Sequence, residues 1–165
     1  MRRITISIIL FSLSSVSFID GLRAEDSPLV EKYLHSGQLA KGEQVQEAAL
    51  ETSPKDDQIR FGLGVLRFVR GVERLGQSLY EYGCRPENTR LPFVRLPIPA
   101  NPDPTPITYS AFRRVLINFQ NDLDSAEKTL AAINDSSVVL PLRLADVRLD
   151  LDGDGRATDK LIDML

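Results

Sequence analysis

The chain contains no tryptophan, one cysteine and one histidine among its 165 residues. A single cysteine excludes an intramolecular disulfide framework and any metal or redox site built from paired cysteines. A single histidine excludes zinc centres that need three histidines or an HExxH helix. The sequence also lacks a Walker motif, a GxGxxG loop and a GxSxG nucleophile elbow. These absences remove the best-known catalytic classes, so we assign no catalytic residue and do not expect an enzyme.

The composition that remains is typical of a globular protein, with 42% hydrophobic and 26% charged residues. The length fits one domain or two small ones. The net charge is −3, and no block of lysine and arginine is present of the kind that follows a phosphate backbone. Nucleic acid is therefore not an expected partner.

Residues 1–24 have the order of a secretory signal peptide. A basic start at Arg2 and Arg3 precedes an apolar run over 4–19, and a short polar stretch ends at Ala24. The run is shorter than the roughly 20 residues of a spanning helix, so a membrane anchor is the weaker alternative. Cleavage near Ala24 predicts an exported protein, periplasmic or extracellular. The mature net charge would be −5 instead of −3, because three arginines and one aspartate are removed.

Residues 25–85 are predicted to form helical hairpins, because apolar side chains recur there at helical spacing. Pro54 is expected to end one helix. Asp56 or Asp57 is expected to cap the next helix, and Gly71 to interrupt it.

A 34-residue frame relates two parts of this region. The related positions are Leu29, Tyr33, Ala49 and Pro54 in the first part, and Leu63, Gly64, Gly76, Tyr80 and Gly83 in the second. The pattern resembles two degenerate tetratricopeptide (TPR) repeats over residues 28–84, which implies paired helices that serve as a protein-interaction scaffold. Gln46 and Arg67 depart from it where an aromatic residue is usual. Plain helical hairpins without repeat ancestry are the alternative.

Residues 86–107 are predicted to be an extended connector, because they hold seven of the ten prolines. Its apolar side chains are expected to lie across the helices; they are Leu91, Phe93, Val94, Leu96 and Ile98. Recognition of a PxxP segment by an SH3-type domain is a weaker alternative in an exported chain.

Residues 108–134 are predicted to form a long amphipathic helix with Thr108 as its N-cap. Its apolar stripe has heptad spacing and consists of Phe112, Leu116, Phe119, Leu123, Ala126, Leu130 and Ile133. The stripe indicates core packing against neighbouring helices, with a homodimeric coiled coil as the alternative. Pro141 is expected to begin a further helix that reaches Leu149.

Residues 138–165 contain the one constellation with recognisable chemistry. Asp150, Asp152 and Asp154 with Gly155 form D-x-D-x-D-G, in which three carboxylates converge and glycine supplies the sharp turn. Ca²⁺ prefers six to eight such oxygen ligands. Residues 150–161 thereby resemble the EF-hand or dockerin type of calcium loop found in secreted bacterial proteins.

The resemblance implies further ligands in the second half of this loop. The carbonyl of Arg156 falls at position 7, and Thr158 at position 9 is placed to hold a bridging water. Leu161 occupies position 12 instead of the usual bidentate glutamate, so Asp159 is the nearest candidate closing ligand and the affinity for calcium should be weak. The alternative is an acidic turn whose aspartates cap the following helix. A second loop would lie beyond Leu165 if the chain is a fragment.

The sequence therefore predicts an exported all-α protein that binds Ca²⁺ and presents a helical scaffold to a protein partner. Two alternatives stay open: a structural helical protein without specific ion binding, and an enzyme with an unrecognised site. A nucleophile–base pair of Cys84 and His35 is disfavoured because no third group accompanies it. The sequence does not indicate an oligomeric state.

Overall fold

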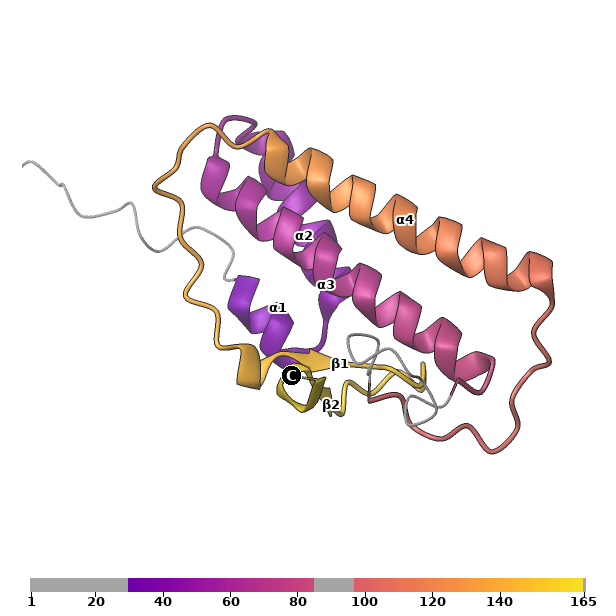
Figure 1. Ribbon diagram of the computed structural model, residues 1–165. Coiled ribbons are helices and arrows are strands. Elements are labelled where there is room, and N and C mark those ends of the chain that lie inside the picture. Colours follow the sequence, from indigo (N-terminus) through magenta and orange to yellow (C-terminus); the bar gives the residue numbers. More distant parts are fainter. Residues whose placement is uncertain (1–29, 85–96, 165) are drawn as a thin grey trace, which may run out of the picture.

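The computed structural model in Figure 1 describes residues 30–84 and 97–164. The predicted leader at 1–24 and residues 86–96 of the predicted connector lie outside these ranges. Residues 97–107 carry no regular secondary structure, as the prolines there require.

The described chain is mostly helical, which confirms the expected class. The four α-helices are α1 (Val30–Ser36), α2 (Leu39–Thr52), α3 (Asp57–Glu81) and α4 (Tyr109–Ala131). The C-terminal part contains two short 3₁₀ turns, η3 (Leu144–Asp146) and η4 (Leu161–Met164). It also contains two strands of two residues each, β1 (Arg148–Leu149) and β2 (Asp159–Lys160).

The helix boundaries follow local side-chain chemistry. The Asp56 carboxylate accepts a hydrogen bond from the backbone N–H of Ile59 at 3.0 Å, and the Thr108 hydroxyl accepts one from Ala111 at 3.1 Å. Helix α2 ends just before Pro54. Both predicted N-caps and the predicted end of α2 are confirmed.

Gly71 does not interrupt its helix, because α3 continues through it for 25 residues. A Cβ atom at Gly71 would lie 3.0 Å from the Cβ of Asp122 in α4. The predicted break is wrong because the missing side chain permits a close approach of two helices. That contact outweighs the propensity cost of glycine, about 1 kcal/mol.

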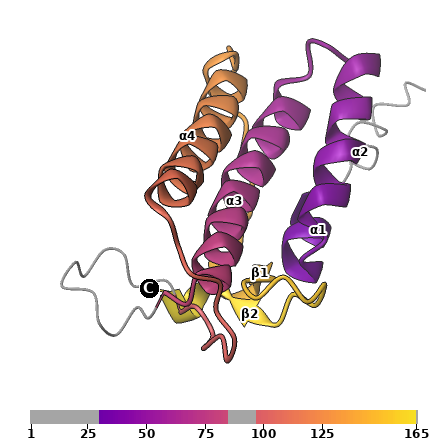
Figure 2. The same cartoon turned by 90° about the vertical axis from the view of Figure 1, so that its right-hand side faces the viewer.

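Helices α2, α3 and α4 lie side by side, with α3 in the middle (Figure 2). Glycines bring the neighbours close to α3. A Cβ at Gly62 would meet the Val30 side chain at 2.4 Å, and a Cβ at Gly64 would meet the Leu130 side chain at 2.4 Å. Both glycines therefore allow neighbouring helices to pack closely on α3.

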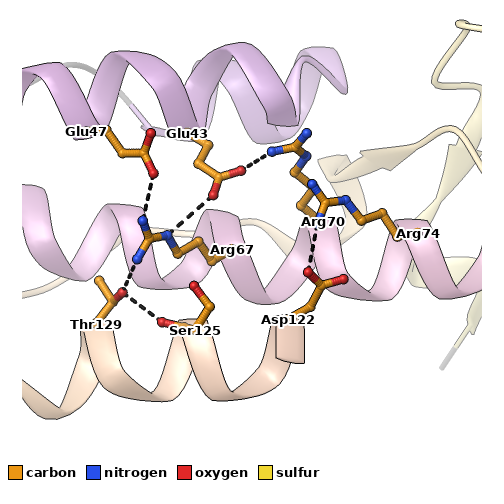
Figure 3. Close-up of polar contacts among 8 residues, drawn as sticks. All are labelled: Glu43, Glu47, Arg67, Arg70, Arg74, Asp122, Ser125 and Thr129. Atoms are coloured by element: carbon orange, nitrogen blue, oxygen red, sulfur yellow. Dashed lines mark hydrogen bonds and ion pairs between the residues drawn. The ribbon is translucent and has the colours of Figure 1, made fainter. Parts of the chain in front are cut away.

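A seam of ion pairs crosses the three helices on one side (Figure 3). The Arg67 guanidinium of α3 donates to Glu47 of α2 at 2.7 Å and to the Thr129 hydroxyl of α4 at 2.6 Å. Glu43 bonds to both Arg67 and Arg70. Arg67 thus joins α2 to α4 through α3.

The most deeply buried part of the core lies between α1, α2, α3 and the C-terminal segment. It combines Leu34, Leu39 and Leu66 of the helices with three side chains of the C-terminal segment, Val147, Leu149 and Leu151. Each of these six residues is at most 1% exposed. The acidic loop therefore begins inside the core.

The predicted helix from Pro141 to Leu149 is wrong. The chain there forms η3 and then β1. Val147, Leu149 and Leu151 alternate with more exposed residues, which is the two-residue period of an extended chain that is buried on one side. After the acidic loop the chain forms only the 3₁₀ turn η4.

The predicted apolar stripe of α4 is core only in part. Ala126 is buried, whereas Phe112 is 46% and Leu116 is 49% exposed. The other buried positions of α4 lie on a neighbouring side of the helix; they are Ala111, Val115 and Thr129. The reason is that α3 approaches α4 from the side of these smaller residues.

Candidate metal centre

The acidic loop is closed by a short antiparallel ladder. Strand β1 pairs with β2 so that Arg148 lies opposite Lys160 and Leu149 opposite Asp159. The ladder brings together the two ends of residues 150–158, at the edge of the core (Figure 1). This pairing fixes where the carboxylates of the loop point.

Three carboxylates of the loop converge. One oxygen each from Asp150, Asp152 and Asp154 lies within 4.8 Å of the others. Asp150 and Asp152 are partly buried, and Asp154 is exposed. Three negative charges this close repel one another unless a cation shares them, and the group is able to hold a metal ion.

The loop is also wrapped around the carboxylate of Asp150. This group accepts backbone hydrogen bonds from Gly153 at 2.8 Å, Asp154 at 3.1 Å and Gly155 at 3.0 Å. Gly153 and Gly155 have φ angles of 74° and 85°, which favour glycine. Local residues therefore build the turn themselves.

Helix α3 holds the main chain of Asp150 from the other side of the loop. The Asp150 N–H donates to the Glu73 carboxylate at 2.9 Å, and the Gln77 side chain donates to the Asp150 carbonyl at 2.8 Å. Sequence reasoning missed both residues. Glu73 follows Leu66 and Val69 at the spacing of the buried face of α3, and a polar residue on that face was the available signal.

The turn between α1 and α2 supports the loop as well. Gly37 has a φ angle of 67°, and a Cβ atom built on it would lie only 1.9 Å from the Cβ of Ala157. Only glycine fits this backbone conformation and this approach without displacement. The loop is thus held by two helical segments far from it in sequence.

Burial and like charges raise the pKa of two carboxyl groups beside the site. Desolvation is the main cause of the raised pKa of Glu73, and the Asp150 charge adds to it, against the hydrogen bond from the Asp150 N–H. Desolvation also raises the pKa of Asp159, with the charges of Asp152 and Asp150 acting in the same direction. A cation in the loop would oppose both like-charge contributions.

The other predicted ligands are placed less centrally. The Arg156 carbonyl accepts a hydrogen bond from the Thr158 N–H at 2.8 Å, and the Thr158 side chain is exposed. Asp159 accepts a bond from the Leu151 N–H at 3.1 Å and is not part of the converging group. The structure brings together Asp150, Asp152 and Asp154 of the six predicted site residues.

No protein-family model, curated protein or solved structure matches the chain. Within residues 30–84 and 97–164, no helix has the length and hydropathy needed to cross a bilayer.

Proposed function

We propose that the protein is an exported helical scaffold that binds Ca²⁺ through Asp150, Asp152 and Asp154. The convergence of these three carboxylates within 4.8 Å is the observation that carries the proposal. Hard oxygen ligands at alternate positions of a tight turn suit calcium better than soft metals. Glu73, Gln77 and Gly37 support it, since they hold the loop in place before any ion arrives.

The remaining ligands are proposed from the resemblance to an EF-hand loop. The second lone pair of the Arg156 carbonyl and a water on Thr158 would complete part of the shell. Asp159 would enter it by giving up its hydrogen bond to Leu151. Because no glutamate follows at the twelfth position, we expect a dissociation constant of roughly 10⁻⁴–10⁻³ M, the range of extracellular modules. Such an affinity fits a protein exported after cleavage near Ala24.

Calorimetric titration with calcium tests the proposal most directly. Asp152→Ala is the informative variant, because Asp152 accepts only one of the loop bonds, from Asp154 at 3.2 Å, and its loss should leave the turn folded. We expect this variant to lose the binding heat. Asp124→Ala, an exposed aspartate on α4, is the matched control and should bind as the parent does.

Two results would reject calcium binding: no heat from the parent protein in millimolar calcium, or equal heat from the parent and Asp152→Ala. A parallel titration with magnesium separates a calcium site from a general response to divalent charge. Magnesium demands near-octahedral geometry and releases its water reluctantly, so we expect it to bind more weakly.

A purely structural acidic turn is the second candidate function. The observation that favours it is the set of three backbone bonds to Asp150, which gives this carboxylate a role without a cation. In that case Asp150→Asn would lower thermal stability equally with calcium and with a chelator. Calcium binding predicts a larger loss in calcium.

The helical part is proposed to present a surface to a protein partner, as the resemblance to TPR repeats implies. Fractionation of cells that express the full chain would test export, with the shortened form expected outside the cytoplasm.

A further inference from the structure

Helix α4 carries more exposed large hydrophobic side chains than any other element of the described chain. Nine large hydrophobic side chains of the described chain are exposed, and four of them belong to this helix: Tyr109, Phe112, Leu116 and Ile117. A shallow groove continues this surface between α4 and α3, and it is lined by Phe68, Leu123, Ala126, Glu127, Leu130 and Ala131. The metal-binding proposal uses none of these residues.

An apolar row runs along α4 and combines two of its exposed residues, Tyr109 and Leu116, with the half-buried Leu123 and Leu130. Tyr109, Leu116, Leu123 and Leu130 are spaced by seven residues, so they repeat on the same side of the helix. The side that packs on α3 is already defined by Ala111, Val115, Ala126 and Thr129. The apolar row lies beside this buried side and meets it at Leu130, whose side chain packs against Gly64 of α3.

The charges beside this row change sign along the helix. Arg113, Gln120 and Glu127 repeat every seven residues, each four positions after a member of the apolar row, and all three are exposed. Within the described chain, neither Arg113 nor Glu127 belongs to one of the ion pairs. Glu127 is a carboxylate in an otherwise apolar groove.

This arrangement is complementary to itself in one orientation only. If two α4 helices pair antiparallel about a two-fold axis at Gln120, Arg113 of each copy meets Glu127 of the other, because each lies seven residues from Gln120. Parallel pairing would instead place arginine beside arginine and glutamate beside glutamate. The apolar rows face each other in both cases, so the charges select the antiparallel pair.

We propose that a second copy of this chain covers the exposed face of α4, as a two-fold antiparallel helix pair centred near Gln120. The pair buries the half-exposed Phe112 and Leu116 and places two Arg113–Glu127 contacts at its edges. It is independent of calcium, because the acidic loop is held by Glu73 and Gln77 of α3 and contributes no residue to the helix pair.

Charge reversal tests the pairing directly in the purified full chain. Sedimentation equilibrium over an about hundredfold range of protein concentration should show a monomer–dimer equilibrium. Arg113→Glu and Glu127→Arg should each weaken the dimer by about tenfold, since both edge contacts become repulsive. The double variant restores opposite charges and should return to within about threefold of the parent protein. Failure of the double variant to recover would overturn the proposal.

Cross-linking locates the two-fold axis. In a Cys84→Ser background, Gln120→Cys should form an intermolecular disulfide on mild oxidation, because the two thiols meet at the axis. Asn121→Cys is the matched control, since the next residue points about 100° away around the helix. Equal cross-linking of both variants would overturn the geometry.

A strictly monomeric parent protein would also overturn the proposal, and Leu116→Asp would then show what covers the face. If this variant unfolds, another segment of the same chain covers the exposed face of α4. If the variant stays folded, a different partner molecule covers that face.

Discussion

The helical layer of α2, α3 and α4 and the acidic loop between β1 and β2 are stabilised by different interactions. In the layer, glycines admit large neighbours, as Gly64 does for Leu130, and an ion-pair seam crosses one side (Figure 3). In the loop, backbone N–H groups converge on Asp150, and two side chains of α3 hold its main chain. Burial stabilises the first region and directed hydrogen bonds shape the second.

This difference matters for ion binding. The layer gains its stability by removing apolar surface from water, and no cation takes part in that process. The loop gathers three carboxylates on a backbone that is fixed to the core. These carboxylates therefore cannot move apart freely to relieve the repulsion between their charges. We therefore expect variants of the layer to respond equally with and without calcium, and variants of the loop to respond unequally.

The largest expected effect is in the layer. Leu63→Ala removes a side chain of α3 that is 2% exposed and lies outside the core cluster of Leu149 and Leu151. It should lower the free energy of unfolding by about 3 kcal/mol, because a cavity remains. Urea unfolding in calcium and in chelator should give the same loss. Val139→Ala, at a residue 67% exposed, is the control and should change stability by less than about 0.5 kcal/mol. A loss that depends on calcium would contradict the comparison.

Gly37→Ala tests the junction between the two regions. The new methyl group must sit at a φ of 67° and within 1.9 Å of the Ala157 Cβ, so the free energy of unfolding should fall by at least about 2 kcal/mol. Gly155→Ala is the matched control, because its φ is 85° but nothing lies within 4 Å. The free energy of unfolding of this variant should fall only by the cost of placing alanine in a left-handed backbone conformation, about 1 kcal/mol. Equal losses in thermal unfolding would show that contact with Ala157 contributes nothing.

The ion-pair seam should contribute less than the buried apolar contacts. Arg67→Met keeps much of the side-chain volume but loses the bonds to Glu47 and Thr129, and we expect a loss of about 1 kcal/mol. The loss should shrink when the urea titration is repeated at high salt. Arg143→Met, at an exposed position, is the control and should leave the free energy of unfolding unchanged. A loss as large as that of Leu63→Ala would show that the ion pairs stabilise the layer as much as its buried apolar contacts do.

The smallest expected effect is on the pH dependence of stability. Glu73 has a pKa raised by burial, so the folded chain binds its proton more tightly than the unfolded chain does. The contribution of Glu73 to stability should therefore be fully present below the ordinary value of 4.5 and be lost as pH rises through the raised pKa. Asp159 acts in the same direction.

Glu73→Gln should flatten this slope, because the amide oxygen still accepts the Asp150 N–H without carrying a charge. Urea unfolding in chelator across this pH window measures the effect. Glu51→Gln, at an exposed position of α2, should keep the slope of the parent protein. If Glu73→Gln leaves the slope unchanged, other titratable groups cause the pH dependence of stability.

Features that depend on neighbouring residues were predictable from the sequence. The caps at Asp56 and Thr108 and the end of α2 before Pro54 each involve atoms within three residues. The convergence of Asp150, Asp152 and Asp154 is also local, because the turn brings alternate residues together. Periodicity likewise identified the long helix that became α4.

Features that depend on distant residues were not predictable. Glu73 lies 77 positions before the N–H that it accepts from, and no local pattern relates the two. Gly71 was expected to break a helix, but the approach of Asp122 makes the missing side chain an advantage. The alternation of Val147, Leu149 and Leu151 was present in the sequence. The helix expected from Pro141 assumed a helical period of apolar residues there instead of the two-residue period of an extended chain.

The sequence by itself determined the N-caps at Asp56 and Thr108, the end of α2 before Pro54, and that three aspartates share one turn, because contacts over a few residues decide each of them. The tertiary structure decided which side of α4 is buried and what fixes the loop to α3. Those outcomes follow from contacts between segments far apart in the chain, whose free energy depends on how closely the backbones approach.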